Sequence, residues 1–175
     1  NGFKFVDLDT SKLTVTSNSN YYGTKSVVYQ DNIPSQVIID YYCGTREYWA
    51  INGHWELNYD PKVLQLSDAS NKQNRKYTLH PSVPGGIAVN NMPESGRAVF
   101  NFSYLDGADL CDENGNPIPF VHLVFDVVGT GSTVVELETK QLVFMESGQA
   151  YDPALATVFN SESADCGKAV RDQLL

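Results

Sequence analysis

The sequence predicts an all-β fold in which two antiparallel sheets pack as a sandwich. Three observations lead to this prediction. Apolar and polar residues alternate with a period of two in several short windows, as in strands with one buried and one exposed face. Gly, Pro, Asn and Asp separate these windows. Apolar residues make up 42% of the 175 residues, which is enough for a core shared by two sheets.

Eight or nine short strands are expected. In chain order, the clearest windows cover residues 13–16, 27–29, 37–42, 51–59, 97–104, 121–127, 133–137 and 140–145. The window 51–59 shows the pattern best, with one face formed by Ile51, Gly53, Trp55 and Leu57 and the other by Asn52, His54, Glu56 and Asn58. The alternation therefore predicts which side chains of this strand are buried.

Only the C-terminal stretch changes character. Asp152 is suited to cap a helix that has Pro153 at its first position, and the apolar residues that follow fit one helical face. We expect a single domain over residues 1–175, with a sandwich core at about 13–145. Residues 148–175 are expected to form a helical or irregular extension that includes a short helical tail.

The charge of the chain excludes several classes of function. The sequence has 12 Lys and Arg against 21 Asp and Glu, a formal net charge of −9. An acidic surface without a basic stripe repels phosphate backbones and anionic membranes. The densest apolar run, 120–128, is shorter than the roughly 18 to 20 residues that span a bilayer.

Patterns of catalysis and metal binding are weak. The sequence lacks a nucleophile elbow, a P-loop, an H-E-x-x-H helix and a G-x-G-x-x-G turn, so we expect no enzyme, no cofactor and no metal. His54 and His122 are more simply explained as exposed histidines than as a two-histidine site. Residues 109–116 resemble part of a calcium loop, but their glycine is misplaced, and an Asn-Gly turn is the favoured interpretation.

Three cysteines, Cys43, Cys111 and Cys166, occur without metal-ligand spacing. They are interpreted as structural or incidental. Whether two of them pair in a disulfide or all three stay reduced is left open.

Aromatic residues are the composition feature best suited to binding. The chain has 10 Tyr, 8 Phe and 2 Trp, and three pairs are adjacent, namely Tyr21-Tyr22, Tyr41-Tyr42 and Tyr48-Trp49. Neighbouring residues of a strand face opposite ways, so one member of each strand pair should be exposed or covered by a loop. Exposed Tyr and Trp suit protein interfaces and the apolar faces of sugars. The candidate carbohydrate-binding residues are Tyr21, Tyr22, Tyr48 and Trp49, whereas the alternation buries Trp55.

Two segments resemble a known family. Residues 51–66 read I-N-G-H-W-E-L-N-Y-D-P-K-V-L-Q-L, which resembles the cohesin signature of a strand, a Tyr-Asp-Pro turn and an x-x-L-x-L segment. Residues 92–102 resemble the cohesin hairpin and its V-F-x-F strand, and the Asp106-Gly107 loop and the strand 120–128 follow in the family's order. The resemblance covers about 13–145. It implies a nine-stranded, jelly-roll-type β-sandwich, cohesin-like and non-catalytic, that binds a dockerin.

The resemblance also implies a binding surface. In cohesins the dockerin lies across one sheet, and the matching positions here are Asn52, His54, Met92, Asn101 and Tyr104. If the family's strand order holds, His122 and Val124 lie on the same sheet. Asn52 keeps the family's usual asparagine. Since His54 stands where an acidic residue is frequent, and Asn101 where an apolar one is frequent, the partner need not be the usual dockerin type.

The implied partner is a dockerin of a secreted glycoside hydrolase or scaffold protein. The implied location is an extracellular, cellulosome-like complex associated with the cell surface. Residues 1–12, the loop 67–84 and the tail after Ser147 have no counterpart in the family pattern. They keep open an alternative, a carbohydrate-binding module for a plant polysaccharide such as starch or cellulose. A surface adhesin is a third, weaker alternative.

Overall fold

The computed structural model describes residues 13–19, 21–43, 47–67 and 78–159, and this part of the chain forms ten strands. The strands are β1 (Leu13–Ser19), β2 (Tyr22–Gln30), β3 (Ile33–Tyr42), β4 (Tyr48–Asn58), β5 (Leu64–Leu66), β6 (Gly86–Met92), β7 (Arg97–Ala108), β8 (Val121–Val127), β9 (Gly131–Glu146) and β10 (Thr157–Phe159). A single 3₁₀ turn, η1 (Pro93–Ser95), lies between β6 and β7.

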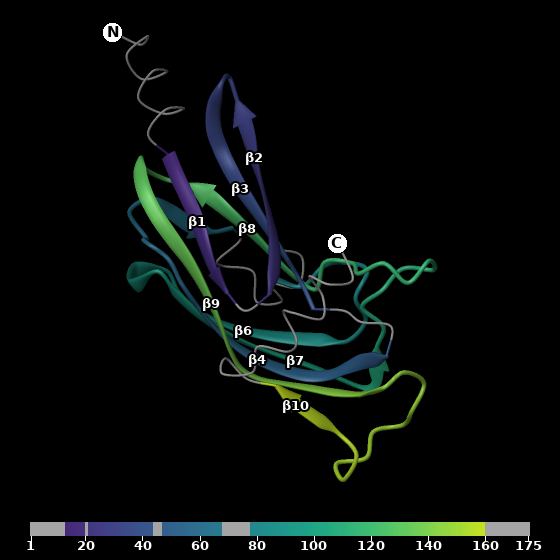
Figure 1. The fold of residues 1–175 in the computed structure, drawn as a ribbon. Helices are drawn as coiled ribbons and strands as arrows, with labels where there is room; N and C mark the ends of the chain where they lie inside the picture. The colour runs from purple at the N-terminus through teal and green to yellow at the C-terminus, as the bar shows by residue number, and fades with distance from the viewer. Residues whose placement is uncertain (1–12, 20, 44–46, 68–77, 160–175) are drawn as a thin grey trace, which may run out of the picture.

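The strands form two sheets that face each other (Figure 1). The first sheet has the order β1-β9-β4-β7-β6, with β10 also paired to β9, and the second has the order β2-β3-β8-β5. The paired strands are antiparallel except β1 and β9, which are parallel. The predicted all-β sandwich is confirmed, with one more strand than the nine expected. Within the described residues, no helix is long and apolar enough to cross a membrane.

The expected C-terminal helix does not form in its described part. Asp152 does accept a hydrogen bond from the backbone N–H of Ala154, at 2.9 Å. This cap closes one turn only, and the chain then extends into β10, where Val158 aligns with Val143 of β9. The backbone groups of β9 beyond its pairing with β1 need partners, and β10 supplies them. The rest of the predicted tail, residues 160–175, lies outside the described residues.

The core between the sheets is built around Trp55 of β4. Its indole stacks on Phe100, with ring centroids 5.6 Å apart, and meets the edge of Phe120 at 5.3 Å. Its Nε1–H donates to the Tyr21 hydroxyl at 3.0 Å. Gly53 leaves room for the ring, since a Cβ there would lie 2.2 Å from Cη2 of Trp55. The strand pattern that buries Trp55 is confirmed.

Ile51 departs from the predicted alternation. A bulge between Ala50 and Asn52 interrupts the pairing of β4 with both β7 and β9. Ala50 stays in the main core, but Ile51 joins a second cluster with Val143 and Met145, against which Ala156 packs. A bulge places two residues opposite one, so the side chains before it change face relative to a strict period of two. The prediction that Ile51 shares a face with Trp55 was therefore wrong.

The segment 109–116 forms the turn that the favoured interpretation predicted. The Asp112 carboxylate oxygen Oδ1 accepts the backbone N–H groups of Asn114 and Asn116, each at 2.9 Å. Gly115 has a φ of 80°, which a glycine adopts without strain. Within the described residues, no three His, Cys, Asp or Glu side chains gather in a group that could hold a metal ion.

Candidate functional site

The outer face of β4 and β7 brings together the polar side chains that the sequence placed there. The two strands are antiparallel neighbours, with His54 opposite Asn101 and Asn52 opposite Ser103. His54 donates its Nδ1–H to the side-chain oxygen of Asn101 across 2.6 Å. The prediction that the stretches around Asn52 and Asn101 are neighbouring strands exposing the same side is confirmed.

Small residues of β6 keep this face flat. Ala88 lies opposite Asn101, and Gly86 lies opposite Ser103. A Cβ added at Gly86 would meet no atom within 4 Å, so the space above this edge is open. Asn101 and Ser103 are exposed, whereas Asn52 and His54 are half-buried. We call this surface the outer amide face; it consists of Asn52, His54, Gly86, Ala88, Asn101 and Ser103.

An ion-pair network borders the outer amide face. The Glu56 carboxylate lies 2.6 Å from the Arg97 guanidinium and 3.2 Å from the Lys140 ammonium. The hydrogen bond from Lys140 lowers the pKa of Glu56, and the charge of Arg97 acts in the same direction. Lys140 also pairs with Glu138 at 3.0 Å. These side chains are therefore held in place by one another at one end of the face.

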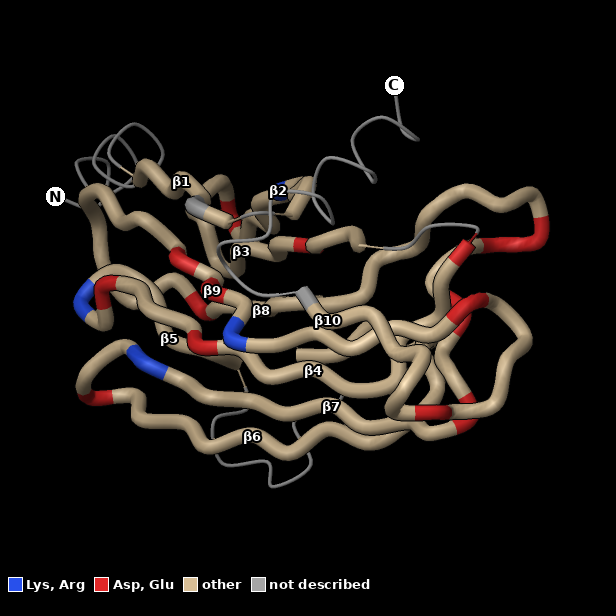
Figure 2. Tube along the Cα trace, turned by 60° about the horizontal axis from the view of Figure 1, so that its bottom comes forward, with Lys and Arg blue, Asp and Glu red and all other residues tan. Residues whose placement is uncertain are grey.

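Acidic residues dominate elsewhere on the molecule. Figure 2 shows Asp and Glu gathered on the loops at the right-hand end of the view, where no described Lys or Arg is drawn. This distribution agrees with the net charge of −9. A partner that docks on the outer amide face therefore meets neutral amides beside a small charged network.

Met92 and Tyr104 differ in their placement. Met92 ends β6 opposite Arg97, at the charged border of the outer amide face. Tyr104 follows Ser103 and points the other way, where it packs against the core between the sheets. The strand alternation explains this, because Tyr104 shares its face with Phe102. The prediction of Tyr104 as a surface contact is corrected.

His122 and Val124 do not belong to this face. Both lie on β8, which pairs with β3 and β5 in the second sheet. Val124 is only 6% exposed. The period-two alternation predicted that β8 is a strand, but it carries no information about which strands pair with β8. The strand order expected from the family resemblance therefore put both residues on the wrong sheet. They are removed from the candidate protein-binding site.

The pair Tyr21-Tyr22 has one buried and one exposed member, as predicted, and this changes the list of candidate sugar platforms. Tyr21 is 4% exposed and its hydroxyl is bonded to Trp55 and Thr139, so it is part of the core. Its neighbour Tyr22 is 37% exposed. Tyr48 and Trp49 are both half-buried, and Tyr48 packs against Phe144. Tyr22 is thus the best-exposed of the predicted platforms.

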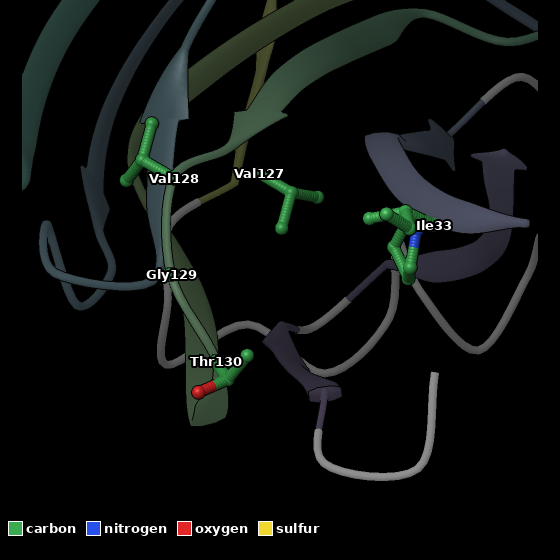
Figure 3. A pocket seen from close by; sticks show the side chains of 6 residues that line it. Ile33, Val127, Val128, Gly129 and Thr130 are labelled. Carbon is green, nitrogen blue, oxygen red and sulfur yellow. The ribbon is translucent and has the colours of Figure 1, made fainter. Parts of the chain in front are cut away.

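A partly open pocket lies where the start of β3 meets the chain between β8 and β9 (Figure 3). Its cavity volume is about 200 Å³, and it is lined by Ile33, Pro34, Val127, Val128, Gly129 and Thr130. None of these side chains is a carboxylate, imidazole or thiol. The side chains that line the pocket therefore supply no acid–base group.

A polar cluster on the second sheet was not predicted from the sequence. The His122 imidazole donates its Nδ1–H to Oδ1 of Asp40 at 2.5 Å, and the His80 ring stands edge-on to His122 with centroids 5.7 Å apart. Burial lowers the pKa of His80, and His122 lowers it further against the opposing effect of Asp40. The sequence feature that could have revealed this cluster is Asp40, which is a charged residue within the predicted strand window 37–42.

The comparisons with known proteins gave structural matches only. No family model and no curated protein matches the chain. The similar solved structures include a type II cohesin domain from the cellulosome of Acetivibrio cellulolyticus, with 14% identity, a TM-score of 0.38 and coverage of 86% of this chain and 82% of that chain. A type II cohesin–X-dockerin complex from the same organism gives 13% identity, a TM-score of 0.36 and coverage of 82% and 89%.

A third match comes from another organism. The solution structure of a Clostridium acetobutylicum protein, CaCohA2, has 12% identity, a TM-score of 0.27 and coverage of 89% of this chain and 84% of that chain. With TM-scores below 0.5, these matches assign neither a family nor a function to this chain.

Proposed function

We propose that the chain is a non-catalytic, cohesin-type module that binds a dockerin through its outer amide face. The partner is a dockerin of a secreted glycoside hydrolase or scaffold protein, in an extracellular polysaccharide-degrading complex. The proposal starts from the cohesin-like motifs at 51–66 and 92–102, which put Asn52, His54 and Asn101 at contact positions.

One observation carries the proposal. His54 and Asn101, which come from the two separate motifs, lie side by side on one exposed surface and are joined by a hydrogen bond of 2.6 Å. The bond holds both side chains in one orientation before a partner arrives, which reduces the entropy lost on binding. The small neighbours Ala88 and Gly86 let a helix or sheet of the partner approach the amides.

The face suits recognition better than catalysis. Its polar groups are amides, one hydroxyl and an imidazole whose Nδ1 already bonds Asn101. A standard interface buries about 800 Å² on each partner, and a few anchors dominate its energy. Half-buried Met92, at the border of the face, supplies an apolar anchor.

Isothermal titration calorimetry against a panel of dockerins from the same genome tests the proposal. We expect at least one dockerin to bind, and the double variant Asn52→Arg/Asn101→Arg to bind it at least tenfold more weakly, which is about 1.4 kcal/mol. The matched control is Ser26→Arg, since Ser26 is an exposed residue of β2 in the other sheet. The control should bind as the unmodified protein does.

Two results would contradict the proposal. Absence of binding to every dockerin in the panel would reject the function. Equal affinity of the double variant and the Ser26→Arg control would keep dockerin binding but reject the outer amide face as its site.

A further inference from the structure

The outer face of the second sheet carries two adjacent rows of side chains. Tyr22 and Tyr42 form an aromatic row, and Asp40 and His122 form a polar row. Tyr22 of β2 lies directly opposite Tyr42 of β3, and their ring centroids are 5.8 Å apart with an angle of 59° between the planes. Asp40 lies opposite His122 of β8. Asp40 and Tyr42 are two positions apart on one strand, so both rows project from the same face, about 7 Å apart.

The polar row is held in a fixed arrangement. His122 donates to Asp40 at 2.5 Å, and the edge of His80 packs against the His122 ring. The backbone N–H of Ser82 donates to Nδ1 of His80 at 3.2 Å, so the neutral His80 ring carries its proton on Nε2. The Asp40 and His122 side chains are 21% and 19% exposed. A ligand can therefore contact them, although most of their surface is shielded from water.

Hydrogen-bonding capacity remains in both rows. Oδ1 of Asp40 is bonded to His122, whereas Oδ2 has no hydrogen bond within the described residues. The hydroxyls of Tyr22 and Tyr42 likewise form no hydrogen bond with any described residue. A carboxylate oxygen beside two aromatic rings can accept from a hydroxyl of a ligand whose apolar face lies on a ring.

We propose that Tyr22, Tyr42, Asp40, His122 and His80 form a binding site for a neutral glycan, here called the tyrosine–aspartate site. A sugar ring stacks on the exposed Tyr22, and its hydroxyls reach the Asp40 row. Neutral glycans are favoured over anionic ones, since Asp40 is a carboxylate on a chain with a net charge of −9. The site lies on the sheet opposite the outer amide face, so it adds a second ligand to the proposed dockerin binding.

Native affinity electrophoresis tests this site. The full chain is run in gels that contain soluble starch, hydroxyethyl cellulose, glucomannan or neutral arabinoxylan, with polygalacturonate as the anionic comparison. We expect retardation by at least one neutral polysaccharide. Tyr22→Ala and Asp40→Ala should each weaken the binding to that polysaccharide at least tenfold.

The matched control is Tyr29→Ala, since Tyr29 lies on the same strand, is 55% exposed and is outside the site. It should be retarded as the unmodified protein is. Calorimetry with the dockerin that binds should give the same affinity for all three variants, which separates this site from the outer amide face. Circular dichroism spectra verify that each variant is folded.

Three outcomes would overturn the inference. They are the absence of retardation by every neutral polysaccharide, retardation by polygalacturonate alone, and equal losses in Tyr22→Ala and Tyr29→Ala.

Discussion

The buried hydroxyl of Tyr21 provides a direct test of the core arrangement. The substitution Tyr21→Phe removes one oxygen and leaves the ring in place. That oxygen accepts the indole Nε1–H of Trp55 at 3.0 Å and the hydroxyl of Thr139 at 2.5 Å. Trp55 is fully buried and Thr139 is 3% exposed, so water does not replace the lost acceptor.

The expected loss follows from these two donors. A buried donor that loses its partner costs about 1–3 kcal/mol. The indole N–H of Trp55 is fixed by its ring and bears this cost, whereas the hydroxyl of Thr139 can rotate about its C–O bond and bears less of it. The free energy of unfolding should therefore fall by roughly 2–3 kcal/mol.

Urea denaturation followed by tryptophan fluorescence measures this change. The control is Tyr22→Phe, the same substitution one residue later on the exposed side, which should alter stability by less than about 0.5 kcal/mol. The midpoint should move for Tyr21→Phe while the slope of the transition stays constant. If the two variants unfold at the same urea concentration, the assignment of Tyr21 to the core is wrong.

Two further predictions concern the same core. Burial raises the pKa of Tyr41 to about 12, so the unfolded chain loses this proton first, and stability should fall by roughly 2 kcal/mol as the pH rises from 10 to 12. Urea titrations across this range should show a shallower decline in Tyr41→Phe, and an unchanged decline would contradict the assignment. Gly53→Ala should cost about 1–3 kcal/mol, because its Cβ collides with Trp55, whereas Gly86→Ala, which meets open space, should leave the melting temperature nearly constant. Equal melting temperatures for both alanine variants would refute this packing.

The strands were the most predictable part of the fold. Windows with one apolar face, such as 51–59 and 97–104, were placed correctly because burial on one side imposes a period of two. The windows 133–137 and 140–145 are parts of the single strand β9. Between these two windows, the pairing of β9 with β4 shifts register at His54 and Trp55. This shift interrupts the alternation of apolar and polar residues in the sequence.

The candidate sites were predictable only where the sequence motifs that supply their residues lie on neighbouring strands. The placement of Asn52 and Asn101 on one face followed from two motifs on strands that proved adjacent. The misplacement of His122 and the omission of Asp40 have one cause, which is that strand order across a sheet depends on long-range packing and leaves no local pattern. The bulge at Ile51 was hidden for a related reason, since its extra residue is apolar like its neighbours.

The parallel pairing of β1 with β9 has a consequence for synthesis on the ribosome. Leu13 aligns with Gly131, so β1, the first strand of the described residues, pairs with a strand that follows it far along the chain. Contacts between residues so distant in sequence require costly loop closure and slow the folding of β proteins. The β1 segment therefore cannot form this pairing until residues 131–137 have been translated. We expect its docking to be the step that completes the sheet and shields the edge of β9 from other nascent chains.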